Sequence, residues 1–250
     1  MSTDWMWVSS EMQRLLRLGT QPVGVKFCRS ADELRAGTAP GGKVSVCQMV
    51  KGAAHAGWRL ACSPEQMGCF TAQMVLGFRA PSDGDVAHHV KQFVDDPDTA
   101  ARLVENKPKL PVDDLAGILV GPLAEGFDPD VVLFLVDGLQ AMGLLQACAH
   151  VAGENIATLN GMSSAVCAYG IVAPFGNGRP NLAVPCVGSR RYGAFQDHEL
   201  ILTLPAGMAG DILERALQME RSKKWPIPLV NAFLSPTIPL NYLVKPPTVS

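Results

Sequence analysis

Four of the seven cysteines in this 250-residue chain form two pairs, which lie in two segments that share one plan. In the first segment, residues 43–70, Cys47 is followed after 14 residues by Cys62. In the second, residues 161–195, Cys167 is followed after 18 residues by Cys186, and in both segments a Gly-x-Phe sequence comes shortly afterwards. Thiolates are soft ligands, so four of them suit a tetrahedral zinc ion or an iron–sulfur cluster.

The similarity of the two segments extends upstream, which indicates a weak internal duplication of about 120 residues. Each segment follows an apolar run typical of a strand, residues 22–27 in the first half and 130–136 in the second. A pseudo-twofold axis between the halves would bring both cysteine pairs to their interface. We therefore predict half-domains at residues 1–106 and 107–224, followed by a proline-rich arm at 225–250.

The leading interpretation of Cys47, Cys62, Cys167 and Cys186 is that they bind one [4Fe-4S] cluster. No C-x2-C pair is present, which argues against a zinc ribbon or a ferredoxin-like site. Three alternatives stay open. The cysteines could bind zinc, or Cys62 or Cys186 could be the nucleophile of a thiol-dependent enzyme. The chain could also be a metal-free dimeric binding or assembly protein with structural cysteines. A free cysteine commonly packs as a small hydrophobe, and we expect only that role of the remaining three, Cys28, Cys69 and Cys148.

Three further side chains near the cysteines are candidates for catalysis. His55 lies among small residues in the first segment, and Arg190 and Tyr192 follow Cys186 between two glycines. An imidazole can transfer protons, and a guanidinium binds carboxylates through paired hydrogen bonds. The pair His88-His89, in contrast, falls on a polar helix and predicts a surface position.

The number of ligating cysteines decides the chemistry that we expect of such a cluster. If all four ligate, electron transfer with a redox partner, or redox sensing, is favoured. If only three ligate, one iron is open to act as a Lewis acid on a hydroxylated or halogenated small molecule, with Arg190 and His55 as substrate partners. We favour an enzyme slightly, an iron–sulfur oxidoreductase or lyase.

Composition and missing motifs argue against other classes of protein. The chain has 21 Lys and Arg against 23 Asp and Glu, a formal net charge of −2, and thus no basic excess for binding nucleic acid. Neither G-x-G-x-x-G nor G-x-x-x-x-G-K-[ST] is present, so nucleotide binding has no support. The G-x-S-x-G and H-E-x-x-H motifs are absent too.

The sequence also predicts a cytoplasmic protein. Its first five residues include an acidic residue, Asp4, and lack the basic start of a secretion signal. The apolar run 131–152 is interrupted by Asp137-Gly138 and has no flanking Lys or Arg, so a buried strand followed by a helix explains it better than a membrane span. Seven cysteines, an odd count, are expected to be reduced in the cytosol.

Hydrophobic periodicity and capping residues predict a mixed α+β fold. Helices are predicted over residues 5–18, 31–35, 82–94, 97–105, 138–151 and 210–221, and strands over 22–27, 115–120, 131–136 and 200–204. Short paired strands are predicted around each cysteine pair, with a turn at residues 176–178 in the second. Residues 106–111, with two prolines, are predicted to link the halves.

The C-terminal stretch from Trp225 to Ser250 holds six prolines among large apolar residues. Such a stretch cannot form a regular helix or a central strand. It is also too apolar to extend into water, so we expect an arm that docks on the body or on a second subunit. A homodimer formed through this arm is the oligomer that we predict.

Several dispersed motifs resemble one protein family, domain-of-unknown-function family 169. They are PVGVKF, VCQMVKGAAHAG, Cys62 followed by Gly68, GMSSAVCAYG, and LAVPCVGSRR followed by DHEL, and the similarity covers residues 22–217. The family's cysteine pattern falls on the same four cysteines that the spacing selects. The resemblance implies no established activity, and Cys69 and the proline-rich arm lie outside the family pattern.

Overall fold

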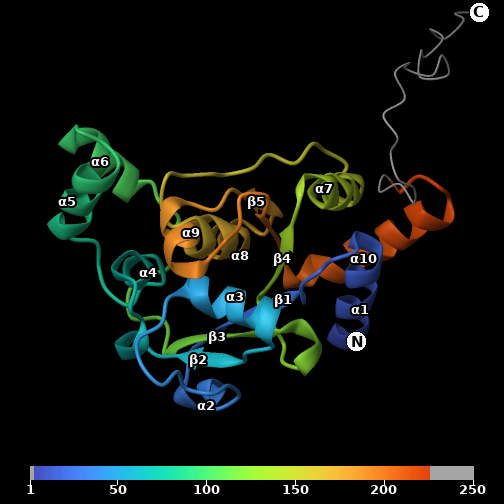
Figure 1. The fold of residues 1–250 in the computed structure, drawn as a ribbon, viewed down its shortest axis with the longest axis horizontal. Helices are drawn as coiled ribbons and strands as arrows, with labels where there is room; N and C mark the ends of the chain where they lie inside the picture. Colours follow the sequence, from blue (N-terminus) through green and yellow to red (C-terminus); the bar gives the residue numbers. More distant parts are fainter. Residues whose placement is uncertain (1–2, 226–250) are drawn as a thin grey trace, which may run out of the picture.

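The computed structural model describes residues 3–225 and contains a six-stranded antiparallel sheet (Figure 1). The strands are ordered β2-β3-β1-β4-β6-β5. At the centre of the sheet β1 pairs with β4, and Val23 of β1 lies opposite Leu133 of β4. The bounds are β1 (Val23–Cys28), β2 (Leu60–Cys62), β3 (Gly117–Pro122), β4 (Val131–Val136), β5 (Asn181–Ala183) and β6 (Leu200–Pro205).

Helices cover both faces of this sheet, because alternate side chains of a strand point to opposite sides. In β4, Val131 and Leu133 belong to one apolar core, whereas Val132 and Phe134 belong to the other. The first core is completed by α3 (Val46–Ala56), α4 (Phe70–Val75) and the π-helix η3 (Ala165–Val172). The second core is completed by α1 (Trp5–Leu16), α7 (Gly138–Ala152) and α10 (Ala206–Arg221).

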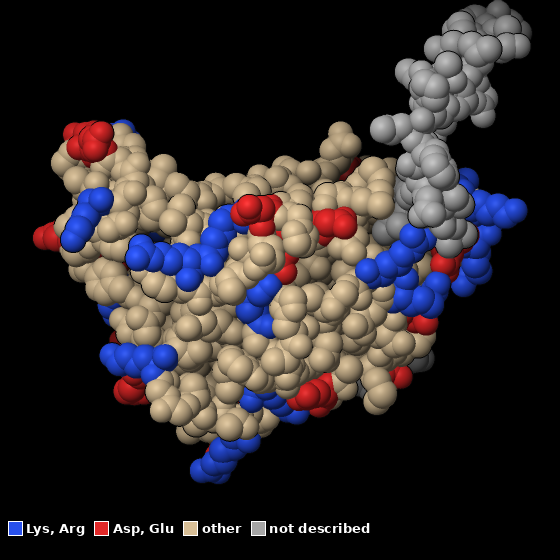
Figure 2. All heavy atoms as spheres, viewed as in Figure 1, with Lys and Arg blue, Asp and Glu red and all other residues tan. Residues whose placement is uncertain are grey.

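The remaining helices are shorter and lie at several places around the sheet (Figure 1). A pair formed by α5 and α6 projects from one end of the molecule, whereas α8 and α9 lie near α3. The bounds of these four helices are α5 (Asp83–Gln92), α6 (Pro97–Glu105), α8 (Ala173–Asn177) and α9 (Val187–Gly193). The short helix α2 (Ala31–Leu34) and the 3-10 turns η1 (Pro64–Gln66) and η2 (Leu123–Glu125) complete the described chain. Figure 2 shows charged side chains of both signs scattered over one face, with large uncharged areas between them.

Most of the predicted helices and strands are confirmed, and with them the mixed α+β fold class. Side-chain caps explain two of the helix starts: Asp4 accepts a hydrogen bond from the amide of Trp7 at α1, and Asp96 accepts one from Thr99 at α6. The apolar run 131–152 is a buried strand followed by α7, as predicted. Within residues 3–225, no helix is both long enough and apolar enough to cross a membrane.

The strand pairs predicted around the cysteines are largely wrong. The residues directly before Cys47 do not form a strand, because the side chains of Ser45 and Gln48 form a reciprocal capping box that begins α3. In the second segment, Ser164 adopts a left-handed backbone conformation, φ 63°, and residues 165–177 after it are helical through η3 and α8. Only the short strands β2 and β5 remain of the predicted pairs.

The strand order bears on the predicted duplication. With the predicted boundary at residue 106, the first half contributes only β1 and β2, and β3 of the second half lies between them. The duplication and the boundary near residue 106 nevertheless stay predictions. The predicted arm lies outside the described residues from Pro226 onward, as does the homodimer that it was expected to form.

Candidate thiol cluster

Four cysteine thiols lie close together where α3, α4, α9 and η3 meet. They are Cys47, Cys69, Cys167 and Cys186, and we call them the thiol cluster. Burial raises the pKa of Cys167 well above its ordinary value, and the nearby thiols of Cys69, Cys47 and Cys186 raise it further. Burial also raises the pKa of Cys47 to about 12, with smaller contributions from Cys186 and Cys69. The four thiols therefore influence one another although they come from both halves of the chain.

Each member of the thiol cluster lies at the beginning of a helix. Cys69 and Cys186 are the N-cap residues of α4 and α9, Cys47 is the second residue of α3, and Cys167 is the third residue of η3. The first N–H groups of a helix have no partner within it, so they are available as hydrogen-bond donors. The other three cysteines lie elsewhere, Cys28 in β1, Cys62 in β2 and Cys148 inside α7.

Cys186 is held by several hydrogen-bond donors. The backbone N–H groups of Ala165, Ser189 and Gly188 lie near its sulfur and lower its pKa. The hydroxyl oxygen of Ser189 lies 3.2 Å from the sulfur of Cys186 and 3.8 Å from that of Cys47. Burial alone would raise the pKa of Cys186, but these hydrogen bonds outweigh it and hold the pKa below that of an ordinary thiol.

A buried lysine lies beside the thiol cluster. The amine of Lys107, a residue only 3% exposed, donates to the hydroxyl oxygens of Ser163 at 2.8 Å and Ser164 at 3.2 Å. It also lies 3.0 Å from Nε2 of His89, whose Nδ1 donates to the backbone carbonyl of Asp85 and thereby leaves Nε2 as an acceptor. Burial lowers the pKa of Lys107, and the cluster thiols and Asp85 oppose this. All three of these acceptors are neutral groups.

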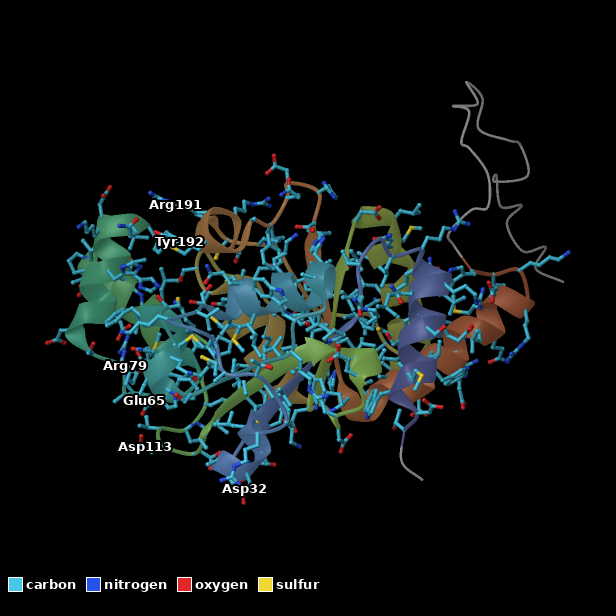
Figure 3. All side chains as sticks on the ribbon, turned by 60° about the horizontal axis from the view of Figure 1, so that its bottom comes forward. Asp32, Glu65, Arg79, Asp113, Arg191 and Tyr192 are labelled. Atoms are coloured by element: carbon cyan, nitrogen blue, oxygen red, sulfur yellow. The ribbon has the colours of Figure 1, made fainter. Side chains whose placement is uncertain are left out.

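This lysine network continues to an ion pair at the start of α5. Both carboxylate oxygens of the buried Asp85 accept hydrogen bonds from Arg79 at 2.7 Å, and the amide of Ser82 donates a third at 2.9 Å. The guanidinium of Arg79 lies 3.8 Å from the ring centre of Phe70, the first residue of α4. Figure 3 shows Arg79 at the end of the molecule that carries α5 and α6. The network therefore ties the α5–α6 pair to the helices of the thiol cluster.

Residues 11–215 match the family model of DUF169, described as "Uncharacterised ArCR, COG2043". The chain belongs to the DUF169 family. It is also similar to "Uncharacterized protein MJ0308" of Methanocaldococcus jannaschii, with 26% identity over 219 residues, which is 82% of this chain and 91% of the relative. No solved structure matches the chain. The resemblance inferred from the dispersed motifs is thereby confirmed.

In this DUF169 chain the structure gathers three of the four predicted ligands and places the fourth elsewhere. The sulfur of Cys62 lies in β2, 3.5 Å from the carbonyl oxygen of Ser63. Burial raises the pKa of Cys62 to about 12, and the charge of Glu65 adds to that rise, with no contribution from the other thiols of the described chain. Cys69 lies beside the other three instead, although its sequence context indicated packing alone.

The sequence held one usable signal for Cys69 and almost none for the lysine network. Cys69 is the middle residue of the Gly-x-Phe sequence that ends the first segment, whereas the second segment has Ala194 at that place. Lys107 lies in the predicted linker, and its burial depends on contacts with residues more than fifty positions later in the chain. His89 is buried against Lys107, contrary to the surface position predicted for it.

His55 and Tyr192 lie apart from the thiols. His55 is near the C-terminal end of α3, roughly 12 Å along the helix axis from Cys47. Its Nε2 lies 2.9 Å from the amine of Lys51, which forms an ion pair with Glu199 at 2.7 Å. Tyr192 is 64% exposed, and Figure 3 shows it projecting from the molecular surface beside Arg191.

Arg190 is the predicted catalytic residue that lies close to a cluster thiol. It lines a cavity of about 410 Å³ together with Cys186. One of its terminal nitrogens, Nη1, donates to the backbone carbonyl of Gln196 at 2.8 Å and to the carboxylate of Asp197 at 3.1 Å.

The spacing of the thiols limits the kind of metal site that this DUF169 chain can hold. Among residues 3–225, no three or more His, Cys, Asp or Glu side chains are arranged as a site for a metal ion. In a tetrahedral zinc site with Zn–S bonds of about 2.3 Å, the sulfurs lie roughly 3.8 Å apart. The thiol cluster does not form such a mononuclear site among the described residues.

Proposed function

We propose that this DUF169 protein binds a [4Fe-4S] cluster through Cys47, Cys69, Cys167 and Cys186. The observation that carries the proposal is the convergence of four thiols, each at the start of a different helix, beside the buried amine of Lys107. Four cysteine thiolates are the usual ligands of such a cluster. In this proposal Cys69 replaces Cys62, the fourth ligand predicted from the sequence.

The electrostatics of the site favour a cationic metal centre. Buried thiols that lie this close cannot all ionise, because each thiolate disfavours the next and burial disfavours every charge. Bound iron supplies the compensating positive charge, and the thiol protons are released as it binds. Lys107 adds a further positive charge whose hydrogen-bond partners are all neutral, so it is available to balance an anionic metal–thiolate group.

We propose a cluster of several irons rather than a single metal ion at these thiols. A cluster of irons and sulfides is larger than one ion, and its four cysteine sulfurs stand further apart than the ligands of a single zinc. Rotation of each cysteine about its Cα–Cβ bond between staggered positions then adjusts the sulfurs to the cluster. Among residues 3–225 no group of cysteines is already arranged to hold a metal ion, so the proposal requires these side chains to rearrange when the cluster binds.

The proposed activity is that of a redox or lyase-type enzyme on a small molecule. When bound, the cluster supplies electron transfer if all four thiolates ligate, or an open iron that acts as a Lewis acid if only three do. Cys186 is the ligand that borders a cavity, so a substrate would approach the metal from its side. A cytoplasmic location belongs to the same proposal, because free thiols persist where they are kept reduced.

The test is metal analysis of protein purified without oxygen. We expect a brown protein with a broad absorption band near ~400 nm and about four irons and four sulfides per chain. Serine substitution of Cys47, Cys69, Cys167 or Cys186 should lower the iron content. Cys62→Ser and Cys148→Ser are the matched controls, because both cysteines are buried outside the thiol cluster. A colourless, iron-free wild-type protein, or equal iron loss in the controls, would refute the proposal.

Thiol chemistry at Cys186 is the second candidate function. It is favoured by the backbone and hydroxyl donors that stabilise a thiolate at this one position. In that case the protein purified without oxygen contains no iron, and iodoacetamide modifies Cys186 rapidly in the untreated protein. In the leading proposal, bound metal protects Cys186 until the iron is removed.

A further inference from the structure

The cavity beside Cys186 has a composition suited to a small ligand. Its volume of about 410 Å³ is within the range of small-molecule sites. Two chain segments form it, and its lining is mainly apolar, with Met162, Val184 and Val187 all substantially exposed to solvent. Exposed apolar side chains that surround one thiol and one guanidinium indicate a surface that a ligand covers.

Hydrogen bonds hold the two walls of this cavity together. The side chain of Asn160 accepts a hydrogen bond from the amide of Val184 at 2.8 Å and donates one to the carbonyl of Leu182 at 3.1 Å. The next residue, Gly161, packs so closely on Tyr169 that a Cβ atom on it would lie 2.3 Å from the tyrosine hydroxyl. The cavity is therefore formed before any ligand arrives, which lowers the entropic cost of binding.

Arg190 is the charged residue in this lining. Its contacts with Gln196 and Asp197 both use Nη1, and they fix the direction of the side chain. Within residues 3–225, neither Nη2 nor Nε of Arg190 is engaged in a hydrogen bond. Asp197 is fully exposed to water, so it neutralises the guanidinium only weakly. The remaining N–H groups suit a carboxylate, which guanidinium binds through two parallel hydrogen bonds.

We propose that this cavity binds a small organic carboxylate with an apolar body, and that Arg190 anchors the carboxylate while Cys186 faces the rest of the molecule. This inference adds a class of substrate to the proposed function. It rests on the proposed function only in that the bound substrate would react at the metal. The cavity, the apolar lining and Arg190 do not depend on bound iron. Binding of the carboxylate can therefore be measured on the iron-free full-length chain.

The experiment compares two alkylating agents at Cys186 that differ in charge. Iodoacetate and iodoacetamide both form an S–C bond to the thiolate and release iodide, but only iodoacetate carries a carboxylate. The rate at Cys186 is followed by mass spectrometry of its peptide in the iron-free full-length protein. The measured quantity is the ratio of the iodoacetate rate to the iodoacetamide rate, because changes in thiol reactivity cancel in it.

Arg190→Gln should lower this ratio on the order of fivefold, since a nearby cation attracts the anionic reagent alone. Arg191→Gln is the matched control, because Arg191 is the neighbouring arginine and does not line the cavity. Butyrate should also protect Cys186 from iodoacetamide at lower concentration than acetate does, and Arg190→Gln should abolish that difference. An unchanged ratio in Arg190→Gln, or the same change in Arg191→Gln, would overturn the inference.

Iron analysis of the same variants separates the two proposals. Arg190 is not a proposed ligand, so Arg190→Gln should bind as much iron as the wild type. If no variant binds iron and the alkylation ratio still depends on Arg190, the carboxylate site stands and the cluster fails. If the iron content is normal and the ratio is independent of Arg190, the cluster stands and the carboxylate site fails.

Discussion

Gly193 of α9 lies so close to Cys47 of α3 that a Cβ atom on the glycine would be 2.7 Å from the Cβ atom of the cysteine. The same added atom would lie 3.1 Å from the ring of Phe195. Real Cβ atoms do not approach this closely, so only glycine allows α9 to pack against α3 at this point. The contact also determines how far Cys186, at the other end of α9, lies from Cys47.

Gly193→Ala should therefore disturb the thiol cluster without changing any cysteine. The added methyl group forces α9 away from α3, which we expect to destabilise the fold by about 1–3 kcal/mol and to lower the iron content. Thermal unfolding and iron analysis measure the two effects. Gly207→Ala is the control, because a Cβ atom at Gly207 meets no atom within 4 Å. Normal iron binding in Gly193→Ala would show that the approach of the two helices is unimportant for the site.

Lys107→Met separates an electrostatic role of the lysine from a structural one. Methionine preserves much of the buried volume and removes a charge whose burial is costly, so the iron-free protein should unfold at the same temperature or a slightly higher one. His89 keeps a hydrogen bond, because its Nε2 lies 3.1 Å from the hydroxyl oxygen of Ser163. The iron content should nevertheless fall, since the cation that balances the metal–thiolate group is gone.

The control for this prediction is Lys109→Met, because Lys109 is exposed and belongs to the same segment. A merely structural role of Lys107 would give the opposite pattern, a lower unfolding temperature with unchanged iron content. Both quantities are measured on the same preparations, unfolding by circular dichroism after removal of iron and iron content before it.

The sequence predicted the four longer strands and helices such as α1, α6 and α7 because their determinants are local, but it did not predict α3. A capping aspartate such as Asp96 and an apolar run such as residues 131–136 depend on only a few neighbours. The thiol site depends on distant contacts. Cys69 joins the cluster because α4 packs on η3, and Lys107 is buried by serines that lie more than fifty residues further on. Cys62 looked equivalent to Cys186 by spacing, but one lies in a strand and the other caps a helix.

The ion pair between Arg79 and Asp85 should make stability depend on pH in the acid range. Burial would raise the pKa of Asp85, but hydrogen bonds from Arg79 and Ser82 outweigh it and hold the pKa below its usual value. A carboxylate whose pKa is lowered by folding stabilises the protein above its unfolded pKa of about 3.9. That contribution is lost as the pH falls through the folded pKa.

Asp85→Asn should therefore lower the free energy of unfolding by about 3–5 kcal/mol at pH 7, because it leaves the partly buried Arg79 without its partner. The difference from the wild type should shrink below about pH 4. Unfolding temperatures recorded from pH 3 to 7 test both statements. Asp32→Asn removes the exposed pair with Arg35 and should change stability by less than about 0.5 kcal/mol. A constant difference across this pH range would contradict the assignment of the acid dependence to Asp85.

Thiol reactivity in the iron-free protein tests the surroundings of Cys186 directly. The hydroxyl of Ser189 and nearby backbone N–H groups hold the pKa of Cys186 below the ordinary value, whereas burial raises the pKa of Cys62 and of Cys148 to about 12. Because the thiolate is the reactive form, iodoacetamide at neutral pH should modify Cys186 well before these two. The rate at Cys186 should rise with pH through a midpoint below about 8.5, the ordinary thiol pKa.

Removing the hydroxyl of Ser189 should raise the pH midpoint of the alkylation rate at Cys186. In Ser189→Ala, the hydroxyl 3.2 Å from the sulfur of Cys186 is lost, so the thiolate is less stabilised and the midpoint should rise by about half to one pH unit. Ser10→Ala, at an exposed position in α1, should leave it unchanged. If Ser189→Ala also leaves the midpoint unchanged, the backbone N–H groups of Ala165, Gly188 and Ser189 alone stabilise the thiolate. A wild-type midpoint well above 8.5 would instead mean that burial dominates at Cys186 as it does at Cys47.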